Sequence, residues 1–425
     1  MTTSATAEPT YKDIDLSDKE FWARPPEERD AAFAVLRKEC PVPWSRPADS
    51  DLLPPEQNLK GFWSLTKMED IRYASRHPEI FSSAQGITME DFPPEMIHIA
   101  QSFIAMDAPR HSQLRGITLD AFKPRNMRRL QDWIQGHARD LITEMSHLGE
   151  GDFVELVSVK LPSRIFGSFF GLPPGDVHEK TINAAQRLLG WTDPEVCGDR
   201  SALELFAGAV MDLHETASIL IPERRENPGD DLISWMVQAE FDGKKMTDDE
   251  LKAFFTLLAV AANDTTRHAS AHAIYALSKF PEQRDLWWAD YDAVAPTAVE
   301  EIIRWSSPVV YMRRTLTQDF ELSGVKMQAG EKVTLWYGSA NRDETKFDRP
   351  WMFDVQRNPN PHLGFGGGGA HFCLGANLAR REIAVAFEEI HRRVPDLTAT
   401  DEPDRLWSQF IHGIKRLPVS WTPPR

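Results

Sequence analysis

The sequence predicts a mainly α-helical protein with small β-sheets. Five long segments carry apolar residues three or four positions apart, which is the spacing of one face of a helix: 126–147, 176–189, 202–222, 247–280 and 297–306. Strand patterns are fewer. Residues 62–65 have one, and residues 320–336 are typical of a small antiparallel sheet with turns at Gly324 and at Ala329-Gly330.

The length and composition favour one large domain. Of the 425 residues, 41% are apolar, which is ordinary for a soluble chain and enough to bury a large core. We expect a flexible N-terminal arm at residues 1–20, because this stretch is polar and then acidic. Residues 21–425 contain no Gly-, Ser- or Pro-rich linker and no repeat, so we expect them to form a single domain.

Charge and cysteine content exclude several classes of protein. The 48 Lys and Arg against 64 Asp and Glu give a net charge of −16, so nucleic acid is not an expected partner. The three cysteines, Cys40, Cys197 and Cys373, are too few and too widely spaced for a disulfide framework. The N-terminus lacks the apolar core of a signal peptide, and the longest apolar run, 254–262, is too short to span a bilayer. We therefore expect a soluble, cytoplasmic protein without a transmembrane segment.

The segment 247–280 predicts one long helix with an unusual centre. Thr247-Asp248-Asp249-Glu250 fits a capping box, and Pro281 ends the pattern, which gives a helix roughly 50 Å long. Its middle contains Asn263-Asp264-Thr265-Thr266, four weak helix formers whose side chains compete for backbone hydrogen bonds. Two interpretations remain open at this point: a functional site inside the core, or a polar face turned to water.

A glycine-rich segment near the C-terminus, 364–375, comes directly before a predicted helix at 376–392. Four consecutive glycines, 366–369, allow the backbone to approach another group closely. Cys373 then falls at the start of the helix, where the dipole and free N–H groups favour a thiolate. The alternative is a buried, inert cysteine after a turn.

Glycine spacing in this segment formally matches a dinucleotide-binding fingerprint. Gly364-x-Gly366-x-x-Gly369 is followed at a suitable distance by Glu388 and Glu389. Both acids, however, fall inside the following helix. Only about fifty residues remain after the segment, too few to complete a doubly wound sheet. A nucleotide-dependent oxidoreductase is therefore a weaker alternative.

Two other ligand classes fit the segment poorly, and one fits well. A P-loop would need Gly-Lys-Ser/Thr, which does not follow. A zinc site would need more than the one close pair, His371 and Cys373. A single thiolate whose opposite side is open suits a haem iron.

Here the sequence resembles the cytochrome P450 family, the haem-thiolate monooxygenases. Phe365…Gly369-Ala370-His371-Phe372-Cys373-Leu374-Gly375 is similar to their haem-binding loop, with one residue more than the common spacing between Phe365 and Cys373. Three further motifs agree in the family's order: Ala261-Ala262-Asn263-Asp264-Thr265-Thr266 with the oxygen-activating stretch of the central helix, Glu301-Ile302-Ile303-Arg304 with the Glu-x-x-Arg motif, and 347–357, ending in Arg357, with the loop that completes that network. The resemblance implies the P450 fold, an α-helical prism around a buried haem.

The resemblance also implies roles for single residues. Cys373 would be the axial ligand of the iron of haem b. The other residues implied in cofactor binding are Phe365 and Gly375 in the loop and the propionate partners His111, Arg115, Arg314 and His371, with Arg313 as the second choice for Arg314. Asp264 and Thr265 would deliver protons to dioxygen. Ala262 stands where close relatives usually have Gly, and Asp264 where they usually have Glu. Glu301, Arg304 and Arg357 would form a buried structural network.

Three longer segments, 298–319, 358–365 and 408–415, resemble the mycobacterial methyl-branched lipid ω-hydroxylases. This implies that O2 and two electrons are used to hydroxylate the terminal methyl of a methyl-branched lipid, an isoprenoid or a sterol side chain. The expected substrate pocket is apolar and comprises Ile87, Met89, Phe92, Ile97, Leu189, Phe206, Val260, Ala261, Val309, Phe410 and Ile411. The alternatives are a monooxygenase of another substrate class, such as a secondary metabolite, and a haem sensor without turnover.

No part of the sequence resembles a flavin or ferredoxin domain, so we expect electrons to arrive from a separate ferredoxin and its NAD(P)H-dependent reductase. Ferredoxins are usually acidic, and a basic docking surface would attract one despite the negative net charge. The candidate basic residues, with Arg115 expected to contact the haem, are Arg110, Lys123, Arg125, Arg128, Arg129, Arg380 and Arg381. A solvated helix face is the alternative.

Overall fold

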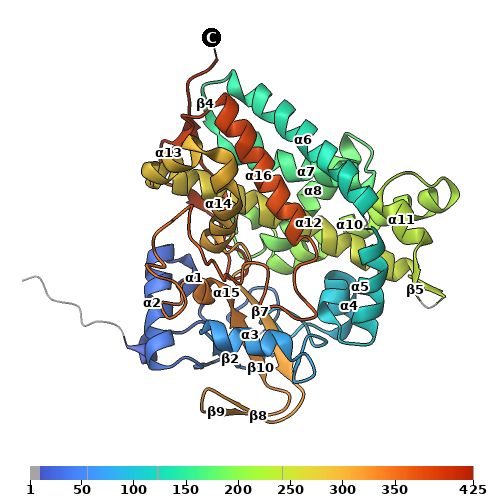
Figure 1. The fold of residues 1–425 in the computed structure, drawn as a ribbon. Coiled ribbons are helices and arrows are strands. Elements are labelled where there is room, and N and C mark those ends of the chain that lie inside the picture. The colour runs from blue at the N-terminus through green and yellow to red at the C-terminus, as the bar shows by residue number, and fades with distance from the viewer. Residues whose placement is uncertain (1–9, 55, 122–123, 242, 425) are drawn as a thin grey trace, which may run out of the picture.

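A computed structural model describes residues 10–54, 56–121, 124–241 and 243–424; of residues 120–129 and 241, no side chain is described. The long helices fill the upper part of the molecule in Figure 1, and the main sheet lies below them with the N-terminal helices. The predicted class, mainly α with small β-sheets, is confirmed. Among the described residues, no helix is both long and apolar enough to cross a membrane.

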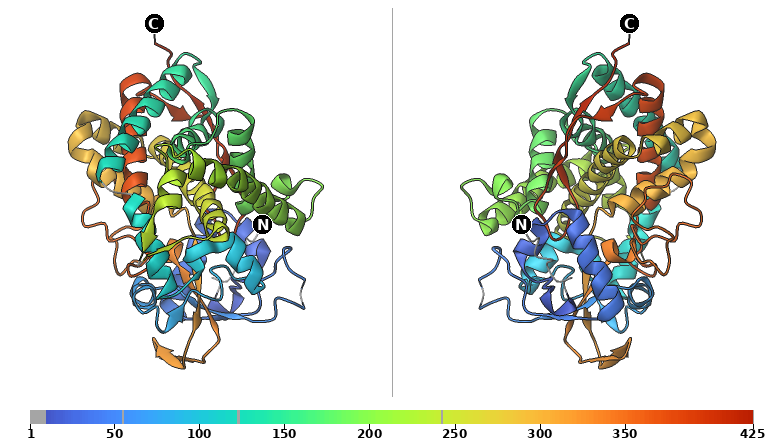
Figure 2. Two further views of the ribbon diagram at one scale, coloured as in Figure 1. Left: turned by 90° about the vertical axis from the view of Figure 1, so that its right-hand side faces the viewer. Right: turned by 90° about the vertical axis from the view of Figure 1, so that its left-hand side faces the viewer.

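Eight helices of eleven residues or more, apart from the N-terminal α2, build the helical part: α5 (Arg110–Ala121), α6 (Pro124–Ser146), α7 (Lys160–Phe170), α8 (Asp176–Leu189), α10 (Ala202–Glu226), α12 (Asp248–Lys279), α14 (Tyr291–Ser306) and α16 (Ala376–Arg393). The views in Figure 2 show α12 crossing the interior, with the other long helices around it. Two predicted boundaries differ. Helix α10 continues beyond Pro222, and α14 begins six residues early and contains Pro296. Both prolines lie inside a helix, because packing against neighbours outweighs the loss of one hydrogen bond.

Shorter elements connect these helices. They are η1 (Tyr11–Asp13), α1 (Lys19–Ala23), α2 (Pro26–Glu39), α3 (Met68–Arg76), α4 (Pro94–Gln101), η2 (Ser102–Ala105), η3 (Val154–Ser158), α9 (Pro194–Cys197), α11 (Leu232–Gln238), α13 (Pro281–Ala289) and α15 (Tyr337–Ala340).

The main sheet has the strand order β1 (Trp44–Ser45), β2 (Phe62–Leu65), β10 (Lys332–Trp336), β7 (Tyr311–Leu316) and β3 (Phe81–Ser82). Strands β10 and β2 are parallel, and the other neighbours are antiparallel. The smaller sheets join β11 (Thr398–Ala399), β14 (Pro418–Ser420) and β4 (Glu150–Asp152); β12 (Asp404–Arg405) and β13 (Ile414–Arg416); β5 (Glu240–Phe241) and β6 (Lys244–Lys245); and β8 (Phe320–Leu322) and β9 (Val325–Met327).

The segment 320–336 only partly follows the prediction of one small antiparallel sheet. Strands β8 and β9 form a hairpin whose turn, Ser323-Gly324, has positive φ at both residues, 50° and 78°. In a two-residue hairpin turn, positive φ at both residues gives the backbone a twist that matches the twist of the two flanking strands. The rest of the segment, β10, leaves the hairpin and pairs with β2 and β7 instead.

Packing of the chain against the domain begins before the predicted boundary at residue 20. Leu16 is 1% exposed and lies in one apolar cluster with Phe21 and Trp22. The indole Nε1 of Trp22 donates to the carbonyl oxygen of Leu16 at 3.1 Å. Of the predicted arm, residues 1–9 lie outside the described part of the chain.

Helix α12 has the predicted cap and end. The Thr247 hydroxyl accepts from the Glu250 N–H and the Glu250 carboxylate accepts from the Thr247 N–H, so two free donors of the first turn are satisfied. Its polar centre is inside the protein: Asn263, Asp264 and Thr266 are all buried. The interpretation as a polar face turned to water is therefore wrong for these three residues.

Candidate active site

The glycine-rich loop is held against helix α3 by its own backbone. Gly366, Gly368 and Gly369 have φ between 78° and 93°, a conformation that other residues rarely adopt. A Cβ on Gly369 would lie 2.4 Å from the carbonyl oxygen of Ser75, so a larger residue would push the loop away from α3. The glycines therefore serve a close approach of backbone to backbone, and the space that a dinucleotide phosphate would need is filled by α3.

This packing places Cys373 at the start of α16. The Cys373 N–H donates to the Phe365 carbonyl at 3.0 Å, and Gly375 is the N-cap of the helix. Burial raises the pKa of the Cys373 thiol, while a hydrogen bond from the Gly375 backbone and the charges of Arg115 and Arg380 act in the opposite direction. Yet the Cys373 side chain is accessible to solvent. A residue surrounded by protein but accessible faces an internal space.

A second accessible position lies on the central helix. Ala261, in the middle of α12, is exposed although its neighbours Asn263 and Asp264 are buried. The Thr265 hydroxyl, one turn later, donates to the Ala261 carbonyl at 3.0 Å. The loop and α12 thus each leave one position uncovered by the protein, Cys373 with its thiol on the loop and Ala261 on the helix.

Hydrogen-bond donors from three segments gather near the loop. The rings of His111 on α5 and His371 lie 4.2 Å apart between centroids, and Nη2 of Arg115 donates to the Phe372 carbonyl at 2.5 Å. Arg314 on β7 is buried, and its Nη1 donates to the Arg313 carbonyl at 2.7 Å. Burial is the main reason why the pKa of His371 is lowered to about 2, and the next causes are Arg314, His111 and Arg115. The structure thus brings together all four predicted propionate partners.

These donors are incompletely satisfied by the protein. Among the described residues, His111 Nε2 is buried without a hydrogen-bond partner. Burial lowers the pKa of His111, the charges of Arg115 and Arg314 lower it further, and Asp107 opposes the shift. Two guanidinium groups and one unpaired ring nitrogen fit the two carboxylates of a haem. Arg313, the second choice for Arg314, contacts the Glu90 carbonyl and Asp91 instead.

The Glu301 network holds the loop that precedes the cysteine segment. Glu301 accepts two hydrogen bonds of 2.7 Å from Arg304 and one of 3.1 Å from Arg357. Asn360 Nδ2 and the Asp354 N–H also donate to Glu301, at 3.0 and 2.9 Å. The structure therefore brings Glu301, Arg304 and Arg357 together in a buried cluster. It fixes the backbone at several points between 341 and 360.

Asp264 is the most deeply buried of the predicted catalytic residues. It is 1% exposed, and burial raises its pKa while Arg267 opposes the rise. The two side chains form an ion pair of 3.1 Å between Arg267 Nη2 and Asp264 Oδ1. Asp264 therefore depends on a single described cation.

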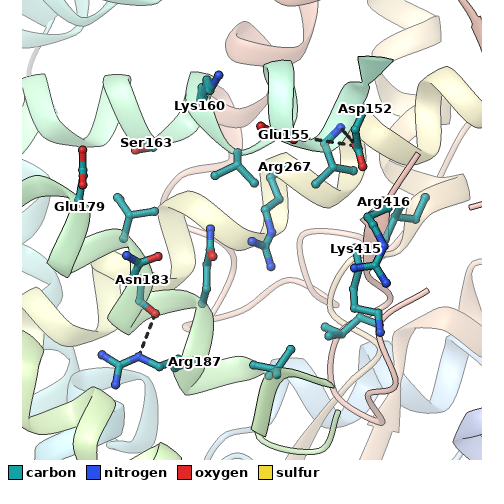
Figure 3. Close-up of a pocket in the computed structure, with 18 of the residues that line it drawn as sticks. Asp152, Glu155, Lys160, Ser163, Glu179, Asn183, Arg187, Arg267, Lys415 and Arg416 are labelled. Atoms are coloured by element: carbon teal, nitrogen blue, oxygen red, sulfur yellow. Dashed lines mark hydrogen bonds between the residues drawn. The ribbon is translucent and has the colours of Figure 1, made fainter. Parts of the chain in front are cut away.

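Arg267 connects this carboxyl to a polar cleft. Charged and polar residues of β4, η3, α7, α8, α12, β13 and the segment around α9 line the cleft. The residues labelled in Figure 3 are Asp152, Glu155, Lys160, Ser163, Glu179, Asn183, Arg187, Arg267, Lys415 and Arg416. Figure 3 shows the Arg267 side chain pointing from α12 into this space. The sequence analysis missed Arg267, although its position three residues after Asp264 places both on one side of the helix.

A separate apolar cavity touches the same stretch of α12. Nine predicted pocket residues line it: Ile87, Phe92, Leu189, Phe206, Val260, Ala261, Val309, Phe410 and Ile411. Thr265 lines it as well. Met89 and Ile97 do not: Met89 is fully buried in the N-terminal aromatic cluster, and Ile97 on α4 packs over Gly86.

Polar residues of this cavity escaped the sequence analysis. They are Thr88, Glu90, Gln101, Thr192, Ser408 and Gln409. Glu90 follows Met89 and Gln409 precedes Phe410, and both of these apolar residues were predicted in the pocket. Side chains alternate along an extended chain, so the residue next to a pocket residue is expected to point away from the cavity. No pattern in the sequence therefore indicated that Glu90 and Gln409 line it.

The comparisons with known proteins agree with this geometry. The family model described as cytochrome P450 matches residues 69–286 and 293–394. The chain belongs to the cytochrome P450 family. This confirms the predicted fold and the predicted class of enzyme, a haem-dependent monooxygenase.

Individual relatives cover nearly the whole of this P450. The methyl-branched lipid omega-hydroxylase of Mycobacterium bovis is 50% identical over 413 residues, 96% of this chain and 95% of that protein. The steroid C26-monooxygenase of Rhodococcus jostii is 36% identical over 98% of this chain and 87% of that protein. The structure of Mycobacterium marinum cytochrome P450 CYP268A2 in complex with pseudoionone has a TM-score of 0.92 and 43% identity, covering 98% of this chain and 100% of that one.

Proposed function

We propose that this P450 hydroxylates the terminal methyl of a methyl-branched lipid, an isoprenoid or a sterol side chain. The observation that carries the proposal is the apolar cavity whose wall includes Ala261 and Thr265 of α12. An apolar chain in this cavity reaches the helix that bears the predicted oxygen-activating residues. The names of the omega-hydroxylase and C26-monooxygenase relatives support the same substrate class.

Haem b is the cofactor in this proposal, and Cys373 is the residue that would hold its iron. When bound, the haem supplies dioxygen binding and the oxidising power that breaks an unactivated C–H bond. A hydrogen bond from the Gly375 backbone opposes the rise in the pKa of the thiol that burial causes, and so favours the thiolate. His111, Arg115, Arg314 and His371 hold the propionates.

Asp264 and Thr265 deliver protons. The Thr265 hydroxyl is bonded to the Ala261 carbonyl at 3.0 Å and lies on the wall of the cavity, where it is placed to orient dioxygen or a water. Asp264, one residue earlier, exchanges protons with water in the polar cleft beside Arg267.

The electron donors in the proposal are a ferredoxin and its NAD(P)H-dependent reductase. Two of the candidate docking residues are already paired: Arg110 with Glu250, and Arg380 with Glu300. The test of this surface uses charge reversal at Arg128 and Arg129 of α6. The side chains of Lys123, Arg125, Arg128 and Arg129 lie outside the described part of the chain.

The decisive experiment is the position of oxidation in a branched substrate. A tertiary C–H bond is weaker than a primary one, so a terminal alcohol as the main product means that the cavity presents the chain end-on. We expect the purified holoenzyme, supplied with ferredoxin and reductase, to give the terminal alcohol from a saturated isoprenoid and from a sterol with a branched side chain. A tertiary or mid-chain alcohol as the main product contradicts the proposal and leaves the family assignment intact.

A further inference from the structure

The apolar cavity contains one buried carboxyl group that the proposed hydroxylation does not use. Glu90 lines the cavity and is 1% exposed. Its Oε1 accepts a hydrogen bond of 2.8 Å from Nε2 of Gln409, another residue of the wall. Its Oε2 is buried and has no hydrogen-bond partner among the described residues. Leaving such an oxygen unpaired costs more than a hydrogen bond contributes, so a partner from the cavity is favoured.

Beside Glu90 lies a second buried polar atom that has no hydrogen-bond partner among the described residues. The hydroxyl of Thr88, which also lines the cavity, is buried without a partner in the described structure. It is close enough to oppose the rise in the pKa of Glu90 that burial causes. Two unpaired oxygens on one wall of an otherwise apolar cavity form a small polar site.

The nearby cations are already occupied. Lys332 donates to the Met89 carbonyl at 2.8 Å and to Asp91 at 3.0 Å. Arg313 donates to the Glu90 carbonyl at 2.9 Å and lies 3.4 Å from Asp91. Neither Lys332 nor Arg313 lines the cavity, so no described cation is placed there to bind an incoming carboxylate, and Glu90 itself would repel one when ionised.

We propose that Glu90 and Thr88 form a head-group site that selects lipids carrying a neutral hydroxyl group over lipids carrying a carboxylate. This inference rests on the proposed function, because it concerns the part of the substrate away from the oxidised methyl. A hydroxyl donates one hydrogen bond to Glu90 Oε2 and accepts one from the Thr88 hydroxyl, so it satisfies both unpaired atoms. It also suits Glu90 in either protonation state, since a hydroxyl can donate and accept.

The test compares head groups on one branched chain. Holoenzyme is titrated with hexahydrofarnesol, its methyl ether and the corresponding carboxylic acid, and the dissociation constants are read from the spin-state change of the haem. Since a hydrogen bond to a charged or buried group contributes about 1–2 kcal/mol, the alcohol should bind about tenfold more tightly than the ether. The acid should bind more weakly than the alcohol by at least as much.

Two variants test the roles of these residues. Glu90→Leu removes the acceptor and should reduce the ratio of ether to alcohol dissociation constants to about twofold or less. Thr88→Val removes a donor that the alcohol and ether oxygens can both use, so it should weaken the binding of both ligands about threefold and leave the ratio nearly unchanged. Glu382→Gln alters another buried carboxyl that does not line this cavity, and it should leave the ratio as in the unaltered protein. The titration of the unaltered protein is informative even where a variant fails to fold.

Equal binding of alcohol and ether by the unaltered protein overturns the inference, and so does a preference that persists in Glu90→Leu. Product analysis separates this failure from that of the proposed function. A terminal alcohol formed without head-group preference rejects the hydroxyl site alone. A head-group preference with oxidation in the middle of the chain rejects the proposed function alone.

Discussion

Arg267 Nη2 lies 3.1 Å from Asp264 Oδ1, and the pair joins a carboxyl that is 1% exposed to a cleft that is open to solvent. The two residues lie three positions apart on α12, so the same helix supplies both the buried acid and its cation. Burial raises the pKa of Asp264 and Arg267 opposes the rise, which makes the charge of this acid sensitive to one neighbour.

Arg267→Gln should destabilise the protein in a pH-dependent manner. At neutral pH the buried carboxylate loses its cation, and we expect unfolding free energy to fall by about 1–3 kcal/mol. The pKa of Asp264 in the folded state is already above its ordinary value of 3.8 and rises further in the variant. The neutral acid needs no cation, so the loss should shrink as the pH falls through the folded-state pKa.

Denaturant unfolding at several pH values checks this prediction. The double variant with Asp264→Asn is the control, because an amide removes the charge that Arg267 compensates. In that background Arg267→Gln should cost little at any pH. A loss that stays constant from neutral to acidic pH, or that persists with Asp264→Asn, would contradict a role for Arg267 through Asp264.

Thr265→Ala should uncouple the reaction. Substrate should still bind, but without the hydroxyl on the cavity wall protons reach dioxygen in a poorly directed way, and more reductant should end in peroxide than in product. Asp264→Asn should lower kcat by about tenfold or more while the dissociation constant of substrate changes about twofold at most. Peroxide yield per reductant and single-turnover rates measure both effects. Unchanged coupling in both variants rejects the proposed relay.

Cys373→Ser should abolish the thiolate signature of the reduced carbon monoxide complex and all monooxygenation. A serine hydroxyl at the start of α16 keeps the loop geometry but is a far weaker donor to iron. Cys40→Ser and Cys197→Ser are matched controls, because both are free, half-buried cysteines elsewhere in the chain. The absorption spectrum and turnover of all three variants decide the assignment, and turnover that survives in Cys373→Ser shows that another residue is the ligand.

Local patterns in the sequence predicted the elements well, and tertiary packing set their ends. The Thr247 capping box and Pro281 defined α12 within one residue at each end, because these signals act within the helix itself. The predicted segment 202–222 ends at Pro222 and the predicted segment 297–306 begins after Pro296, but both prolines lie within helices. The place of β10 in the main sheet could not be predicted from local patterns either, because its partner β2 lies far away in the sequence.

The residues of the candidate site also fall into two groups: those that short motifs indicated and those that the sequence analysis missed. Cys373, His371 and the Glu301 network belong to short motifs that the sequence analysis singled out. In the structure Cys373 comes just before α16, and Glu301 pairs with Arg304 and Arg357. Glu90 and Arg267 were missed because what distinguishes them is burial and direction: each is an ordinary charged residue in the sequence. Only the fold makes one the wall of a cavity and the other the link between a cleft and a buried acid.

Arg128→Glu with Arg129→Glu should slow reduction by a ferredoxin. Reversing two charges on the docking surface lowers the rate of association, and the loss should shrink as salt screens the charges. Stopped-flow reduction at low and high salt measures it, with substrate affinity as the internal control. Equal rates for the unaltered and double-variant proteins at low salt exclude this surface.

Glu301→Gln should be among the most destabilising single changes in the protein. The Glu301 carboxylate accepts from Arg304 and Arg357, and the Arg304 and Arg357 side chains are themselves buried. Replacing the carboxylate by an amide leaves two buried guanidinium groups without their counter-charge, a loss of about 3–5 kcal/mol. Glu300→Gln is the matched control: Glu300 is the preceding residue and pairs with Arg380 and His362, but it is partly exposed, so we expect a loss of about 1 kcal/mol or less. Because the Glu301 network anchors the backbone before the cysteine loop, Glu301→Gln should also lower haem content after purification, whereas Glu300→Gln should retain it. Denaturant unfolding and haem content measured on both variants test the prediction. Equal losses of unfolding free energy and of haem in the two variants would mean that the buried Glu301 network contributes no more than the partly exposed ion pairs of Glu300.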